Sequence, residues 1–336
     1  ARMRAYGETM RDVARGHFEK LAPGQRFVAH DVTRAISLDV ILRTVFGVSE
    51  GALFVEARAA LEQTLSGFSP LLIFMRGLQR PWFPAWRRFS AGRAFLDRLV
   101  RDEVERRRAV GEGAEGSTDI LAMLAFARHE DGSLLAHEEI RDHLHTLLVA
   151  AHETTAIAIA WALYWLARHP AKLERLRAEI AALGDAPEPE SLAKLPYLSA
   201  ICDESLRLNT IVPDPVRKLV RPLTVRGVTV PAGFGLCIAS DVIHQDPSVY
   251  PEPTAFRPER FLERKPSPFE FLPFGGGHRR CIGAAFSDYE ARIALATAVI
   301  VVPHPSQKDE ALPPFDFSRA ALASIPAFVV SHAVAA

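Results

Sequence analysis

Apolar side chains recur at helical spacing over most of the first two hundred residues, with polar side chains between them. In an amphipathic helix the apolar positions return every three to four residues and form one buried face. This spacing predicts helices over residues 1–21, 34–47, 52–66, 90–110, 137–169, 170–183 and 197–208. Helices therefore dominate the expected structure.

The longest predicted helix covers residues 137–169 and ends before Pro170, because a proline ring cannot continue a helix. With a rise of roughly 1.5 Å per residue, it is about 50 Å long and can cross a whole domain. Residues 144–167 are apolar enough for a membrane span, but His152 and Glu153 lie near the middle. A charge at that depth costs roughly 3 kcal/mol. We therefore expect a buried central helix and no membrane span.

The pattern changes after the last of these helices. Short β-prone runs separated by glycine and proline predict strands over residues 216–220, 223–230 and 235–239. Residues 244–274 are rich in proline and show little periodicity, and an apolar helix is predicted over 282–301. The expected fold class is mostly α with a small β portion (α+β).

Two further segments interrupt the helices. Residues 67–89 are aromatic, apolar and broken by proline, which favours a lid over an apolar pocket; a membrane-touching segment is the alternative. Residues 111–118 are polar and predict a loop. Ser117 or Thr118 at its end is expected to cap the helix that follows.

Composition excludes several classes of function. The 336 residues carry no net charge, so there is no bulk signal for nucleic-acid binding. Hydrophobic residues make up 49% of the chain, enough for a core that encloses a cofactor. Cys202, Cys237 and Cys281 lie far apart, which argues against a disulfide framework and against a structural zinc site. The chain opens on polar helical sequence rather than a signal peptide, and we expect a cytoplasmic location.

The segment 274–283 reads FGGGHRRCIG and places one cysteine, Cys281, before the last predicted helix. A thiolate there faces the positive end of the helix and its unpaired N–H groups, which suits Cys281 to be a metal ligand or a nucleophile. The glycines allow a flat ligand to approach closely, and Arg279 and Arg280 can bind anionic groups on it. Haem has a flat macrocycle and two propionates, and a cysteine thiolate is one of its known axial ligands.

Other interpretations of the same segment fit less well. A phosphate cradle would also use glycines before a helix, but the spacing matches neither the dinucleotide-binding fingerprint nor the P-loop. A catalytic pair of Cys281 with His278 needs a geometry that adjacency in sequence does not establish. A buried, inert cysteine is the commonest case for a lone cysteine, but the surrounding glycines and arginines argue against it.

Residues 150–155, AAHETT, lie midway along the long predicted helix. Ala150 and Ala151 are small enough for a large ligand to pack against the backbone, and Glu153 with Thr154 could relay protons. Alternatively, a threonine hydroxyl bonds a carbonyl one turn earlier and Glu153 reaches a polar neighbour. The residues alone leave both interpretations open.

Glu204 and Arg207 share one face of the helix predicted over 197–208, because they are three positions apart. Spacing alone favours an exposed ion pair, which contributes little to stability. This ExxR pair follows the acid-threonine helix and precedes the cysteine segment.

The three signals in this order resemble the cytochrome P450 family of haem-thiolate monooxygenases, of the soluble bacterial type. Residues 256–261, FRPERF, look like the family's PERF segment. The resemblance covers roughly residues 1 to 300. The family's Phe-x-x-Gly-x-Arg-x-Cys-x-Gly signature is matched by Phe274, Gly277, Arg279, Cys281 and Gly283.

The resemblance implies haem b as the cofactor, with Cys281 as its axial ligand. It implies that Arg279 and, on the strand after the ExxR helix, Arg217 bind the propionates, and that Phe274 packs beside the sulfur and tunes the iron. The glycines that the resemblance places against the haem are Gly275, Gly277 and Gly283.

Two other groups acquire roles from the resemblance. It implies that Glu204 and Arg207 form a buried triad with Arg260, in place of an exposed ion pair, and that the triad supports the cysteine loop. Glu153 and Thr154 are expected to deliver protons during oxygen activation. The step at Ala150–Ala151 is expected to leave a groove for dioxygen beside the haem, and residues 67–89 are expected to be the lid.

The resemblance also implies the extent of the domain. Residues 1–336 are expected to form a single monooxygenase domain, with the long helix at 137–169 and the cysteine loop at 274–283. Members of the family are longer than this chain, and roughly the first quarter of the domain is expected to be absent.

The implied function is haem-dependent insertion of one atom of O2 into an apolar organic substrate such as a fatty acid, terpenoid or polyketide. Electrons are expected from a separate ferredoxin or flavodoxin with its reductase. One alternative is a peroxygenase that uses peroxide directly, which an arginine near the distal side of the iron would favour. Another is a truncated haem-binding fragment without activity.

Overall fold

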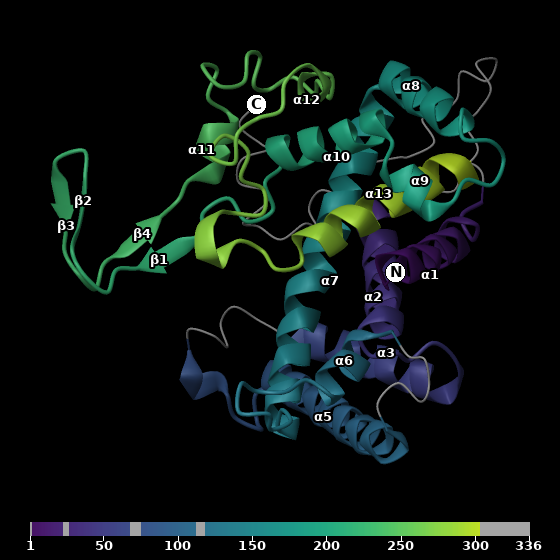
Figure 1. Ribbon diagram of the computed structural model, residues 1–336, viewed down its shortest axis with the longest axis vertical. Helices are drawn as coiled ribbons and strands as arrows, with labels where there is room; N and C mark the ends of the chain where they lie inside the picture. Colours follow the sequence, from purple (N-terminus) through teal and green to yellow (C-terminus); the bar gives the residue numbers. More distant parts are fainter. Residues whose placement is uncertain (1, 23–26, 68–74, 112–117, 303–336) are drawn as a thin grey trace. The chain divides into compact units, whose positions relative to one another are not determined.

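The computed structural model describes residues 2–22, 27–67, 75–111 and 118–302 (Figure 1). The chain divides into two compact units. The first contains residues 1–13 and 34–153, and the second contains residues 14–33 and those from 154 onward.

Helices make up most of the described residues. In chain order they are α1 (Arg2–Phe18), α2 (Ala29–Thr44), α3 (Gly51–Gly67), η1 (Arg76–Leu78), α5 (Pro84–Val110), α6 (Ile120–Ala125), α7 (His137–Arg168), α8 (Pro170–Ala181), α9 (Pro189–Ala193), α10 (Pro196–Leu208), α11 (Ser240–His244), α12 (Arg260–Glu263), η2 (Gly277–Arg279) and α13 (Ala284–Val301).

The first unit is built around an apolar core from α2, α3, α5, α6 and the start of α7. Leu42, Leu61, Leu96 and Leu144 are fully buried in it. The helices α3 and α5 pack closely because Gly92 has no side chain: a Cβ there would lie 2.6 Å from the carbonyl oxygen of Ala60.

In the second unit α10 contacts α8, α9, α11, α12 and α13. A proline in the first turn starts each of α8, α9 and α10, where its missing N–H is not needed. The strands form two antiparallel pairs. The first joins β1 (Val216–Lys218) to β4 (Gly235–Cys237), and the second joins β2 (Leu223–Val225) to β3 (Val228–Val230) (Figure 1).

The predicted fold class is confirmed, and most predicted elements are found with shifted ends. The helix predicted from residue 34 begins at Ala29, and the helix predicted from residue 90 begins at Pro84. The expected cap at Thr118 is wrong: the carboxylate of Asp119 caps α6 by accepting the N–H of Ala122 at 2.8 Å. Ser117 lies outside the described residues.

The helix α7 reproduces the long helix predicted over 137–169. Among the described helices it alone is long and apolar enough to cross a membrane, judged by length and composition. Because 61% of its most apolar stretch is buried inside the protein, it also fits the core helix that the sequence predicts. The candidate lid at 67–89 stays a prediction, since residues 68–74 lie outside the described residues.

Candidate functional site

The cysteine loop, residues 274–283, is closed by a backbone hydrogen bond. The N–H of Cys281 donates to the carbonyl oxygen of Phe274 at 2.9 Å. The turn between them requires glycine, because Gly275 and Gly277 have φ angles of +68° and +65°. This backbone turn therefore places the cysteine next to the start of α13.

The loop presents its sulfur to the outside of the second unit. Cys281 and Arg279 are exposed, and the neighbouring Ile282 side chain is 94% exposed. A Cβ placed on Gly277 would meet no atom within 4 Å, so the backbone of the loop is open to a flat ligand. At Gly283, the nearest atom to such a Cβ is the sulfur of Cys281, at 3.9 Å.

One apolar side chain anchors the loop to the rest of the unit. Phe274 is half-buried and packs on a small apolar cluster from α7, α10 and the segment after α10. The buried members of that cluster are Ile157, Ala158, Trp161, Leu206 and Ile211.

Glu204 accepts hydrogen bonds from two arginines. Arg207, on the same helix α10, donates to it from Nε and Nη2 at 2.8 and 2.9 Å, and Arg260 on α12 donates from Nε at 3.1 Å. The side chains of Glu204 and Arg207 are fully buried and that of Arg260 is buried. The interpretation of Glu204 and Arg207 as an exposed ion pair is therefore wrong.

Further hydrogen bonds satisfy the remaining donors and acceptors of this triad, as buried charges require. Arg207 donates to the carbonyl oxygen of His244 at 2.7 Å, and Arg260 donates to that of Pro251 at 2.9 Å. Glu204 also accepts the backbone N–H of Arg257 at 2.8 Å. The triad thus fixes the irregular chain between α11 and α12 to α10.

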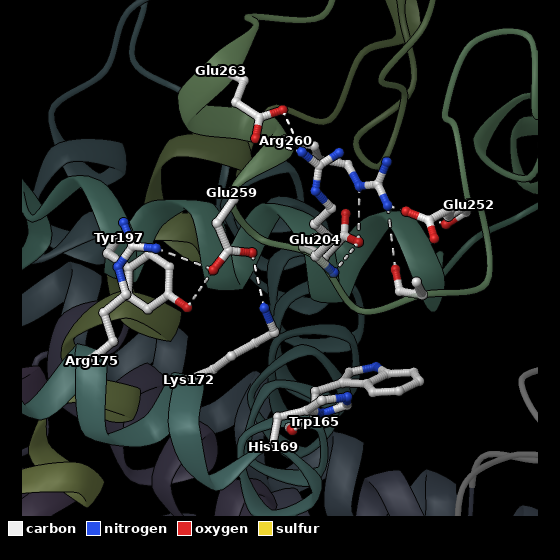
Figure 2. A network of polar contacts seen from close by, with 12 residues as sticks. Trp165, His169, Lys172, Arg175, Tyr197, Glu204, Glu252, Glu259, Arg260 and Glu263 are labelled. Atoms are coloured by element: carbon white, nitrogen blue, oxygen red, sulfur yellow. Dashed lines mark hydrogen bonds and ion pairs between the residues drawn. The ribbon is translucent and has the colours of Figure 1, made fainter.

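A second polar network lies beside the triad (Figure 2). The Glu259 carboxylate receives hydrogen bonds from Lys172 at 2.9 Å, Arg175 at 3.2 Å and the Tyr197 hydroxyl at 3.0 Å. Partial burial raises the pKa of Glu259, but the hydrogen bonds, led by that from Lys172, hold it below its usual value. Sequence reasoning missed these partners, which lie more than sixty residues away.

In the first unit, Glu153 on α7 pairs with Arg34 on α2. The Arg34 Nε lies 3.2 Å from a Glu153 carboxylate oxygen, and the Nδ1 of His152 lies 3.6 Å from the same oxygen. Ala150 is exposed and the half-buried Ala151 packs against the core of that unit. No local signal in the sequence points to Arg34 as a partner.

In the second unit, Thr154 is half-buried, and its neighbour Thr155 is buried with its hydroxyl 3.0 Å from that of Ser287. That contact joins α7 to α13. Arg217 on β1 donates to the carbonyl oxygen of Val216 at 3.0 Å. Within the described part of the chain, no hydrogen bond joins Arg217 to the cysteine loop.

Comparison with known proteins identifies the family of this chain. The cytochrome P450 family model matches residues 2–316. Cytochrome P450 135B1 of Mycobacterium tuberculosis is 37% identical over 77% of this chain and 54% of its own length. Cytochrome P450 135A1 of the same species is 32% identical over 88% of this chain and 63% of its own length. The chain therefore belongs to the cytochrome P450 family.

Two solved structures share the fold. A retinoic acid-bound cyanobacterial CYP120A1 has a TM-score of 0.75 and 27% identity, and covers 89% of this chain and 67% of its own. The haem domain of cytochrome P450DA has the same TM-score and identity, over 88% of this chain and 66% of its own. The chain spans between about half and two thirds of the length of the curated relatives it matches.

Proposed function

We propose that the whole protein is a haem-dependent monooxygenase that inserts one atom of O2 into an apolar organic substrate. The observation that carries the proposal is the exposed Cys281 on a glycine loop, in a chain of the cytochrome P450 family. The activity is proposed for the full-length protein, because this chain covers only part of its relatives.

The residues of the cysteine loop fit haem b. Cys281 supplies one sulfur ligand, the apolar Ile282 lies beside it, and the open backbone at Gly277 leaves room for a macrocycle. A single thiolate suits an iron that brings its own macrocycle. Arg279 would bind a propionate, and Arg217 the second.

The bound haem supplies a redox-active iron that activates O2 with two electrons and a pair of protons. The residues of the protein would hold the Cys281 thiolate in place and transfer protons to the oxygen site. Thr154 would present its hydroxyl as a proton donor at the oxygen site, and Glu153 would exchange protons with solvent while Arg34 holds its carboxylate. The groove for dioxygen would lie at Ala150–Ala151.

The substrate is proposed to be apolar, of the fatty acid, terpenoid or polyketide kind. The retinoic acid bound in the structure of CYP120A1 supports this class. Electrons would come from a ferredoxin or flavodoxin with its reductase, and the location would be cytoplasmic.

The test is the spectrum of the reduced full-length protein with carbon monoxide, followed by turnover with a ferredoxin system. A red-shifted Soret band and substrate-dependent product are expected, and their absence contradicts the proposal. Product from hydrogen peroxide alone, with none from the electron-transfer system, would instead indicate a peroxygenase. If the full-length protein gives the red-shifted Soret band and residues 1–336 alone do not, residues 1–336 alone do not hold haem.

A further inference from the structure

His244, the last residue of α11, is fully buried between α10 and the chain that leads into the cysteine loop. Its Nδ1 lies 2.7 Å from the Thr210 hydroxyl, two residues beyond α10. Its Nε2 accepts the backbone N–H of Leu272 at 2.9 Å, two residues before the cysteine loop begins. Both ring nitrogens therefore make hydrogen bonds, Nδ1 to the segment after α10 and Nε2 to the segment before the cysteine loop.

These contacts allow one form of the imidazole only. The Leu272 N–H can only donate, so Nε2 must carry a lone pair. The Thr210 hydroxyl donates its own hydrogen to the carbonyl oxygen of Leu206 at 3.2 Å, so it accepts from Nδ1. His244 is thus neutral with its proton on Nδ1.

The surroundings favour this neutral form. The ring lies against Tyr250 and Phe271, at 6.3 and 5.7 Å between centroids. Burial, followed by the charge of Arg207, lowers the pKa of His244 to about 4, and Asp241 on α11 opposes this shift. The facing helix α10 also carries Glu204, which is paired with Arg207, and Asp203.

Backbone hydrogen bonds extend this connection from His244 toward the triad and from Leu272 toward the cysteine loop. On one side its carbonyl oxygen accepts the hydrogen bond from Arg207 of the triad. On the other, the Leu272 carbonyl accepts the N–H of Gly275, and the Phe274 carbonyl accepts that of Cys281. A short chain of hydrogen bonds therefore runs from the triad to the cysteine.

We propose that His244 is a positioning residue that ties the triad helix to the start of the cysteine loop and thereby sets the position of Cys281. The inference rests on the proposed function, since position matters there for thiolate ligation. A protonated ring would place an N–H against the N–H of Leu272, so protonation of His244 would break this connection.

The test uses the full-length, haem-loaded protein with ¹⁵N-labelled histidine. The variant His244→Phe keeps a ring but removes both hydrogen bonds of the imidazole. In His244→Gln the side-chain amide can still accept from the N–H of Leu272 and donate to the Thr210 hydroxyl. The control is His129→Phe, the same change at an exposed position. The measurements are the nitrogen shifts of the imidazole, exchange of the Leu272 amide, and the share of thiolate-ligated haem in the carbon monoxide spectrum between pH 5 and pH 8.

We expect a neutral His244 with its proton on Nδ1 throughout this range. His244→Phe should speed exchange of the Leu272 amide at least tenfold more than that of α10 amides and lower the thiolate-ligated share. His244→Gln should restore most of the slow exchange of the Leu272 amide and most of the thiolate-ligated share. His129→Phe should change neither quantity. A ring that titrates near pH 6.5, or equal losses in the Gln and Phe variants, overturns the inference. If wild type lacks the thiolate band, the proposed function fails, while the nitrogen shifts and amide exchange still decide the role of His244.

Discussion

Arg260 reaches from α12 to α10 and donates from Nε to the Glu204 carboxylate at 3.1 Å, with both side chains buried. Removing one partner of a buried ion pair leaves a charge without compensation, which costs more than the pair itself contributes. The guanidinium of Arg260 also satisfies the carbonyl oxygens of Pro251 and Glu252.

Arg260→Ala should therefore lower the free energy of unfolding by roughly 3 kcal/mol or more. Urea unfolding followed by circular dichroism measures the change. Arg264→Ala is the matched control, because Arg264 is half exposed and pairs with Glu270 on the surface. We expect a loss of about 0.5 kcal/mol for the control. Equal losses in the two variants would contradict a structural role for the triad.

The sequence alone could predict the helices and the cysteine loop, because both depend on local signals. Apolar spacing marks α7, and glycines at the left-handed positions Gly275 and Gly277 mark the turn before Cys281. Helix starts were less predictable: α2 and α5 begin at Ala29 and Pro84, before their predicted starts at residues 34 and 90, and α5 has a proline in its first turn. The cap of α6 was misplaced by one residue, since aspartate at 119 competes with the hydroxyl residues before it.

Burial of charge was the property that spacing could not show. Glu204 and Arg207 at i and i+3 look the same on an exposed helix face as in a core, and only the resemblance to the family implied burial. Partners distant in sequence, such as Arg34 for Glu153, depend on how helices pack. Residue spacing within one helix carries no information on such a contact.

Cys281 is expected to be the only described cysteine whose removal abolishes the thiolate signature. Cys281→Ala should eliminate the red-shifted Soret band of the reduced carbon monoxide complex, because the loop then offers no anionic sulfur to the iron. Cys237→Ala is the control, since Cys237 is also exposed but lies on β4. A band that survives in the Cys281 variant would exclude this residue as the ligand.

Thr154→Ala should preserve haem binding but divert electrons to peroxide or water, because the proposed proton donor is lost. Consumption of reduced nicotinamide, compared with product formed, measures this coupling. Thr155→Ala is the same change one residue later, where the hydroxyl contacts Ser287 instead. We expect the control to cost about 1 kcal/mol of stability and to leave coupling near that of wild type. Full coupling in the Thr154 variant would remove Thr154 from the mechanism.

Burial raises the pKa of two carboxylates in the second unit, Asp203 and Asp288, and the charge of Arg292 opposes this rise. Asp288 on α13 pairs with Arg292, through contacts of 2.7 and 3.0 Å, and Asp203 on α10 accepts only a long hydrogen bond from Ser199 at 3.5 Å. Burial, and then the charge of Asp288, raises the pKa of Asp203 to about 7. Asp203 is therefore protonated in the folded protein at a pH where it is ionised in the unfolded chain.

A folded-state pKa above the unfolded value stabilises the protein at low pH and loses that contribution as the pH rises. For Asp203 the loss should fall between about pH 4 and pH 7. Each pKa unit corresponds to about 1.4 kcal/mol, and partial solvent exposure of Asp203 reduces the full effect to roughly 2 kcal/mol.

Asp203→Asn should flatten the dependence of unfolding free energy on pH over this window. Asp185→Asn, the same change at an exposed residue, should leave the slope as in wild type. A slope unchanged by Asp203→Asn would show that this carboxylate is ionised in the folded protein, with Arg292 compensating both charges.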